Sequence, residues 1–140
     1  MTGPPASPIR DLPTLLAALT PQLDPATYVF ATLPDGLAPA AALATIREAE
    51  GLSAILPAEG RAGPPMRRIT LAVPSDLEAV GLTAAVAAAL TAENIPCNVV
   101  AGHHHDHLFV PAARAGDALA VLEALQGHAR GQTPRSHDPG

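Results

Sequence analysis

Residues 75–111 read SDLEAVGLTAAVAAALTAENIPCNVVAGHHHDHLFVP, and this stretch decides the fold. Its alanine-rich part has apolar residues at helical spacing and ends at Pro96, which predicts one helix. Residues 98–101 and 108–110 are apolar and rich in strand-forming types, so we expect two strands with the histidines between or within them. Residues 68–73 form a further predicted strand just upstream. The helix would bury one face, made by Leu82, Val86 and Leu90.

The N-terminal half predicts a short helix followed by strands. Asp11 can cap a helix whose leucines recur at intervals of three and four residues. Residues 27–33 are β-branched and aromatic, which predicts a strand. Residues 42–48 and 52–56 flank Glu50-Gly51 and suggest a β-hairpin, although alanine-rich 38–50 could instead be helical.

Proline and glycine divide the chain into segments. Two of each fall in residues 58–65, the best candidate for a linker. A last helix is predicted over residues 117–125. The expected organisation is a disordered arm (1–10), an N-terminal half (11–64), a C-terminal domain (65–126) and a disordered tail (127–140). Neither half has a large apolar surface of its own, so the two should share a sheet or dimerise.

The composition excludes several functions. All eight positive residues are arginine, so no lysine is present for a Schiff base, a pyridoxal phosphate or a phosphate-binding loop. A net charge of −5 and only three aromatic residues argue against nucleic-acid binding. No apolar run approaches the roughly 20 residues that span a bilayer. The N-terminus also lacks the charged-then-apolar pattern of a signal peptide, so we expect a cytoplasmic protein without membrane contact. The single Cys97 is best explained as a small buried hydrophobic residue.

The start of the predicted helix is a candidate ligand site. Ser75 and Glu78 have the spacing of a capping box, which would begin the helix at this point. Gly81 costs about 1 kcal/mol relative to alanine inside a helix, so it would serve either a close approach of backbone or ligand or a tight packing of the helix on the sheet. Free amides at a helix N-terminus can hold a small anion.

These segments resemble a known family in order and spacing over residues 11–126. The matching motifs are EAEG (48–51), RITL (68–71), LEAVGLTAA (77–85), NVVA (98–101) and HDHLFVP (105–111). They are similar to those of small bacterial proteins with tandem ACT-like domains, which are distantly like the cytosolic arginine sensor of animals. The resemblance implies an α+β, ferredoxin-like fold. Two ACT-like βαββαβ units, the first degenerate, would form an antiparallel sheet with helices on one face.

The resemblance also implies an amino-acid site and a homodimer. The amides of Gly81–Thr83 would meet a carboxylate, and the strand bearing Asn98 would form the opposing wall. Asp76 departs from the family pattern and could hold an ammonium group, while a turn at His105 and Asp106 would lie at the edge of the site. The candidate ligand-binding residues are Ser75, Asp76, Val80, Gly81, Leu82, Thr83, Asn98, His105 and Asp106.

Three other hypotheses compete with that of an amino-acid site. A metal could bind the cluster His103–His107, but alternate residues on a strand lie roughly 7 Å apart, which is too far for three to share one ion easily. No nucleophile with a local motif accompanies the histidines, so we expect no enzyme and no cofactor. Arg67 and Arg68 would pair with Glu48 and Glu50. The chain could also be a dimerisation module that binds no ligand.

Overall fold

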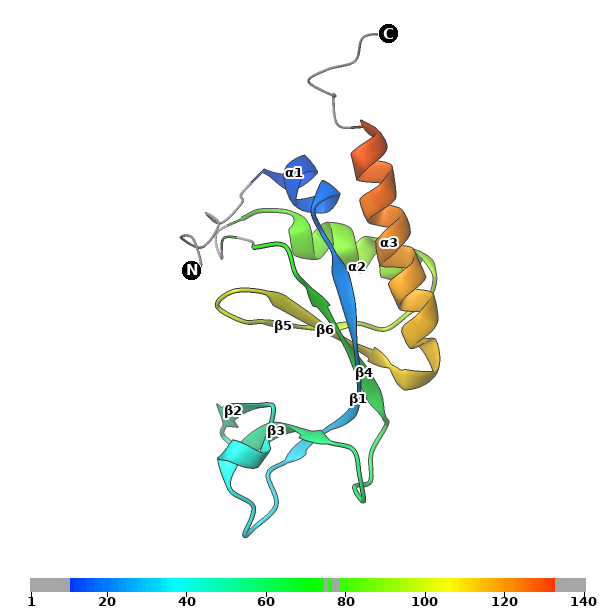
Figure 1. Ribbon diagram of the computed structural model, residues 1–140. Helices are drawn as coiled ribbons and strands as arrows, with labels where there is room; N and C mark the ends of the chain where they lie inside the picture. Colours follow the sequence, from blue (N-terminus) through cyan, green and yellow to red (C-terminus); the bar gives the residue numbers. More distant parts are fainter. Residues whose placement is uncertain (1–10, 75, 77–78, 133–140) are drawn as a thin grey trace, which may run out of the picture.

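The order of helices and strands follows the sequence prediction (Figure 1). The structure is a computed structural model and describes residues 11–74, 76 and 79–132. The elements are α1 (Leu12–Ala17), β1 (Pro21–Thr32), the 3-10 helix η1 (Pro39–Ala41), β2 (Ala44–Glu48), β3 (Gly51–Pro57), β4 (Met66–Leu71), α2 (Leu82–Ala92), β5 (Asn98–Ala101), β6 (Asp106–Pro111), the 3-10 helix η2 (Ala112–Arg114) and α3 (Ala115–Gln132).

The six strands form one antiparallel sheet in the order β2-β3-β1-β4-β6-β5. The pairing of β1 with β4 joins the two halves of the chain, as expected from their small apolar surfaces. In the C-terminal half, β4, α2, β5, β6 and α3 follow the order of a βαββα unit. Strand β1 lies beside β4, where the last strand of a ferredoxin-like unit would pair. The α+β, ACT-like fold class is confirmed.

All three helices contribute to a core on one side of the sheet, called here the helix-facing side. The side chains of Leu15 (α1), Val86 (α2) and Leu122 (α3) are fully buried there against Ile69 and Val110 of the sheet. Burying a leucine or valine side chain contributes about 1.5–3 kcal/mol. The core therefore depends on residues from both halves of the chain.

The opposite side of the sheet, called here the helix-free side, has its own small apolar cluster. Tyr28, Ile55 and Phe109 are buried in it, and Val100 packs against them. Phe109 lies edge-on to Tyr28, with ring centroids 6.0 Å apart. The sheet curls around this cluster, and Figure 1 shows the β2–β3 and β5–β6 hairpins extending to the same side of β1 and β4.

Several element boundaries differ from the sequence prediction, three of them by several residues. The hairpin is confirmed, but β1 begins at Pro21 rather than at residue 27, because its first residues pair with β4. Residues 79–81 are not helical, and α2 begins at Leu82. Helix α3 continues to Gln132, so residues 127–132 are helical and do not belong to the expected disordered tail.

Contacts with α1 explain the longer α3. The side-chain amide of Gln126 donates to the carbonyl of Ala17, and its oxygen accepts from the amide of Thr20. The Nε of Arg130 also donates to the Ala17 carbonyl, at 3.0 Å. Extending a helix that has already nucleated costs little free energy per residue, because each added residue also adds a hydrogen bond. The expected arm (1–10) and the rest of the tail (133–140) lie outside the described residues. Within the described part, the helices are too short or too polar to cross a membrane.

Candidate functional site

Helix α2 begins at a glycine with left-handed backbone. Gly81 has φ +98° and is the N-cap of α2, so the N-cap residue itself has no side chain that could accept from the first amides of the helix. A Cβ built on Gly81 would lie 3.1 Å from Cδ2 of Leu12, so α1 approaches this turn closely. Ser75 and Glu78, the expected capping box, lie outside the described residues. The first amides of α2 have no partner within the helix itself.

The residues around this helix start divide into buried and accessible groups. Leu82 is 3% exposed and packs in the core, so only its amide can face a ligand. Val80 is 83% exposed, and Thr83 is also exposed. The carbonyl of Asp76 accepts a hydrogen bond from the amide of Ala79 at 2.9 Å, which forms a turn before the helix.

His105 and Asp106 lie at the same end of the sheet as the loop that leads to α2. The Nδ1 of His105 is 3.5 Å from the carbonyl oxygen of Val73, just after β4. Asp106 is paired with Leu71, the last residue of β4. Paired residues of an antiparallel ladder project to the same side, so Asp106 faces the side that carries α2. The turn itself closes through the amide of Gly102, which donates to the carbonyl of His105 at 2.9 Å.

Asp106 lies in an environment that disfavours its charged form. Partial burial raises the pKa of its carboxyl, and this effect outweighs the opposing influence of His107 and His105. Among the described residues, its side chain forms no salt bridge or hydrogen bond. Asp106 is therefore a partly desolvated carboxylate without an ion-pair partner among the described residues.

Asn98 does not lie near the start of α2 or near Asp106. It pairs with Phe109, so its side chain is on the helix-free side, whereas α2 covers the other side. Ala101 pairs with Asp106. Asn98 is three residues from Ala101 along β5, or roughly 10 Å at the usual rise per residue. The strand bearing Asn98 thus lies beside β6 rather than opposite the start of α2.

The histidines do not form a metal site within the described part of the chain, where no three His, Cys, Asp or Glu side chains are placed to hold one ion. The rings of His103 and His104 contact each other, with centroids 4.8 Å apart. His107 projects to the helix-free side, and its Nδ1 lies 2.9 Å from Oγ1 of Thr70. Burial lowers the pKa of His107, as do the charges of Arg68 and His105. The metal alternative has no geometric support here.

Cys97 is half-buried beside the main core. Burial raises the pKa of its thiol to about 11. A thiol with so high a pKa is almost entirely protonated at neutral pH, and the thiolate is the reactive form. The expectation of a packing role agrees with this environment.

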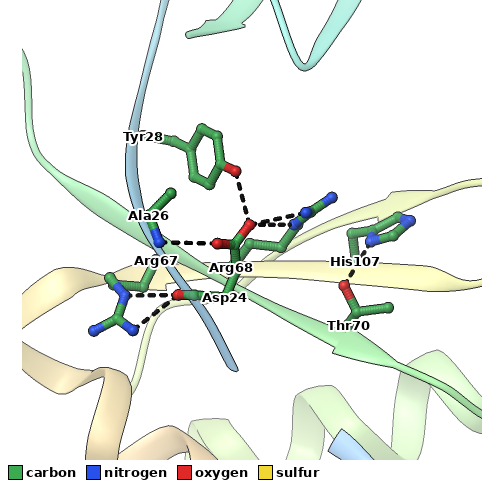
Figure 2. Close-up of polar contacts among 7 residues, drawn as sticks. All are labelled: Asp24, Ala26, Tyr28, Arg67, Arg68, Thr70 and His107. Atoms are coloured by element: carbon green, nitrogen blue, oxygen red, sulfur yellow. Dashed lines mark hydrogen bonds and ion pairs between the residues drawn. The ribbon is translucent and has the colours of Figure 1, made fainter. Parts of the chain in front are cut away.

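A polar cluster around Asp24 was not expected from the sequence (Figure 2). The carboxylate of Asp24 accepts hydrogen bonds from the hydroxyl of Tyr28 at 2.7 Å and from Nη2 of Arg68 at 2.8 Å. Arg67 donates through Nε and Nη2 to the backbone oxygen of Asp24. The predicted pairing of these arginines with Glu48 and Glu50 is wrong for Arg68, whose ion pair is with Asp24. The partners are 43 and 44 residues apart, so no local pattern could indicate them.

Comparison with known proteins identifies the class. Two family models, both described as ACT domain, match residues 7–62 and 62–124. The chain therefore belongs to the ACT-domain family, whose members are regulatory modules that bind small ligands.

Solved structures agree with this class. One is VC0802, a Vibrio cholerae protein of unknown function that is described as a "possible transport protein". Its sequence is 40% identical to this chain and the TM-score is 0.72. The match covers 82% of this chain and 95% of VC0802. Atu0741 from Agobacterium tumefaciens is 15% identical with a TM-score of 0.55, covering 71% and 81%. The ligand-free regulatory subunit of aspartate kinase from Thermus thermophilus is 12% identical with a TM-score of 0.56, covering 77% and 97%. The last two share the fold alone. A search of the curated proteins gave no match.

Proposed function

We propose that this protein binds an amino acid in a regulatory role, at the end of the sheet where β4 leads into α2. The start of α2, where the N-cap is a glycine, would receive the carboxylate through the amides of Gly81, Leu82 and Thr83. The partial positive charge of a helix N-terminus adds to these hydrogen bonds. Asp106 would receive the ammonium group, with Asp76 as a second carboxylate and His105 at the edge of the site.

The observation that carries this proposal is the environment of Asp106. A carboxylate that is partly desolvated and lacks a cationic partner within the described residues gains most from a ligand that brings a positive charge. It projects to the side of the sheet that carries α2. An amino acid has the two opposite charges that such an arrangement can separate. Exposed Val80 would contact the ligand side chain.

We propose further that the protein forms a homodimer. Strands β2 and β5 are the two edges of the sheet, and edge strands present unpaired amide and carbonyl groups. Pairing of edges between two copies would satisfy these groups. If the protein dimerises and binds no amino acid, it is a ligand-free dimerisation module.

A thermal-shift screen with the twenty amino acids tests the proposal. A ligand at 100 times its dissociation constant should add about 2.7 kcal/mol of stability, which corresponds to a rise of several degrees in melting temperature. Light scattering of the same samples gives the oligomeric state. The absence of any shift at millimolar concentrations would argue against amino-acid binding.

The variant Asp106→Asn tests the site. It should weaken binding of the responding amino acid at least tenfold, a change of about 1.4 kcal/mol. Its own melting temperature at pH 7 should be equal or higher, because the substitution removes a carboxylate whose charged form is disfavoured. Asp35→Asn, in an exposed turn, is the matched control and should bind as the unmodified protein does. Equal binding by both variants would exclude Asp106 from the site.

A further inference from the structure

The curled sheet forms a half-open cavity on the helix-free side. Its volume is about 340 Å³. Strands β2 and β5 are the opposite edges of the sheet, yet both contribute to its wall. Ile55 of the apolar cluster on this side lines the cavity, and so do Ala44 and Val100, which pack against that cluster. The lining residues are Phe30, Ala31, Thr32, Ala44, Ile46, Ser53, Ala54, Ile55 and Val100.

The lining is apolar apart from two hydroxyl groups. Phe30 and Ile46 are 44% and 58% exposed, which is high for large apolar side chains. The polar groups are the hydroxyls of Thr32 and Ser53, and none of the described residues that line the cavity is charged. The Oγ of Ser53 donates its hydrogen to Oε1 of Glu48, so toward the cavity it can only accept. A carboxylate or ammonium placed here would lose hydration and would meet only these two hydroxyls, with no side chain of opposite charge among the lining residues.

We propose that this cavity binds a small, neutral, largely apolar molecule that carries one hydroxyl or amide hydrogen. The apolar part would replace water over Phe30, Ile46 and Val100, and the hydrogen would be donated to Ser53. The volume is roughly twice that of the 150 Å³ apolar cavity known to take up benzene, so a medium-chain alcohol or a molecule of one or two rings fits. A pocket of this size with few polar groups is typical of small-molecule sites.

This site differs from the proposed amino-acid site in place and in chemistry. It lies on the opposite side of the sheet, and its lining selects against charge. A second cavity of about 250 Å³ lies next to it and is also lined by Phe30, together with Met66 and Asn98. Asn98, predicted as a wall of the amino-acid site, would instead contact the end of a longer apolar ligand.

Fluorescence of the neutral probe N-phenyl-1-naphthylamine tests the proposal on the full chain. We expect a saturable rise with one site per chain. The competitor 1-octanol should displace the probe, and octanoate, of equal chain length but charged, should do so at least tenfold less well. Leucine should not displace it, whether or not leucine binds elsewhere. Absence of saturable binding, or equal displacement by octanol and octanoate, would overturn the proposal.

Two substitutions fill the cavity from opposite walls. Ala44→Leu acts from β2 and Val100→Phe acts from β5, and each should weaken probe binding at least tenfold. Thr45→Leu is the matched control. Thr45 is next to Ala44 on β2, and neighbouring side chains of a strand project to opposite sides, so Thr45 faces away from the cavity. Either filling variant is sufficient if the other does not fold. Probe binding unchanged in a folded filling variant would refute the site, and so would probe affinity that falls as protein concentration rises, since a second copy of the chain would then occupy it.

Discussion

At the scale of single residues, Asp24 holds an irregularity of β1 in place. The register of β1 against β4 shifts between Leu23 and Thr27, so the residues between them leave the regular ladder. The carboxylate of Asp24 closes this bulge locally by accepting from the amide of Ala26 at 2.8 Å. It also ties the bulge to β4 through Arg68 (Figure 2). One side chain thus fixes both the bend and the pairing that joins the two halves.

Asp24→Asn should lower the free energy of unfolding at pH 7 by about 1–3 kcal/mol, because hydrogen bonds to a charged group would be lost. Partial burial acts to raise the pKa of Asp24, but hydrogen bonds from Ala26, Tyr28 and Arg68 and the charge of Arg68 hold it below its ordinary value. The unfolded carboxyl has the higher pKa, near 3.9, so the advantage over Asn is complete above about pH 4. It is lost as the pH falls through the folded pKa. Urea unfolding from pH 7 to pH 3 measures this.

The control for this experiment is Asp35→Asn, which changes the same charge in an exposed turn. Its unfolding free energy should follow that of the unmodified protein at every pH. A difference between Asp24→Asn and the unmodified protein that stays constant down to pH 3 would mean that the charge of Asp24 does not contribute.

At the scale of elements, local periodicity was sufficient to predict the type and order of the helices and strands. The apolar spacing of α2 and the β-branched content of β1 are properties of adjacent residues, so the sequence contains them directly. The ends were predicted less well, because they depend on distant contacts. Gln22 is strand because it pairs with Thr70, and α3 extends because Gln126 and Arg130 bond to Ala17. Such distant partners cannot be identified from the neighbouring residues in the sequence.

The start of α2 gives a prediction at this scale. Gly81→Ala should destabilise the protein by about 1–2 kcal/mol, because a left-handed backbone disfavours a Cβ. The added methyl would also press on Leu12. Gly127→Ala, inside α3 with open space around its Cβ position, should stabilise by about 0.5–1 kcal/mol. In denaturant unfolding, the two substitutions should change the free energy of unfolding in opposite directions. Stabilisation by both would show that Gly81 does not hold the left-handed conformation.

At the scale of the whole molecule, the candidate sites differ in how far the sequence could indicate them. Gly81, Leu82 and Thr83 are consecutive, and a glycine before a helix is a local signal. The cavity on the helix-free side combines β2 with β5, whose lining residues Ala44 and Val100 are far apart in the chain. It exists only because the complete sheet curls. The sequence therefore indicated the candidate site at the start of α2, which stays a prediction, and it did not indicate the cavity that needs both halves of the chain.

The same dependence predicts how the molecule unfolds. Leu15 and Leu19 of the N-terminal half are fully buried in a core shared with α2 and α3, and β1 pairs with β4 across the two halves. Neither half can bury its apolar surface alone, so we propose that residues 11–64 and 65–132 form one cooperative unit. A protease site inserted between Ala62 and Gly63, in the exposed loop before β4, provides the test.

After cleavage, the two fragments should stay together in size-exclusion chromatography, because the strand pairing and the core are retained. Circular dichroism should show one unfolding transition, at a lower temperature than for the intact chain, because the covalent link no longer limits the entropy of the unfolded state. Each fragment expressed alone should show no cooperative transition. A cooperative transition in either isolated fragment would mean that the halves are independent domains, and the cavity between β2 and β5 would then depend on docking rather than on folding.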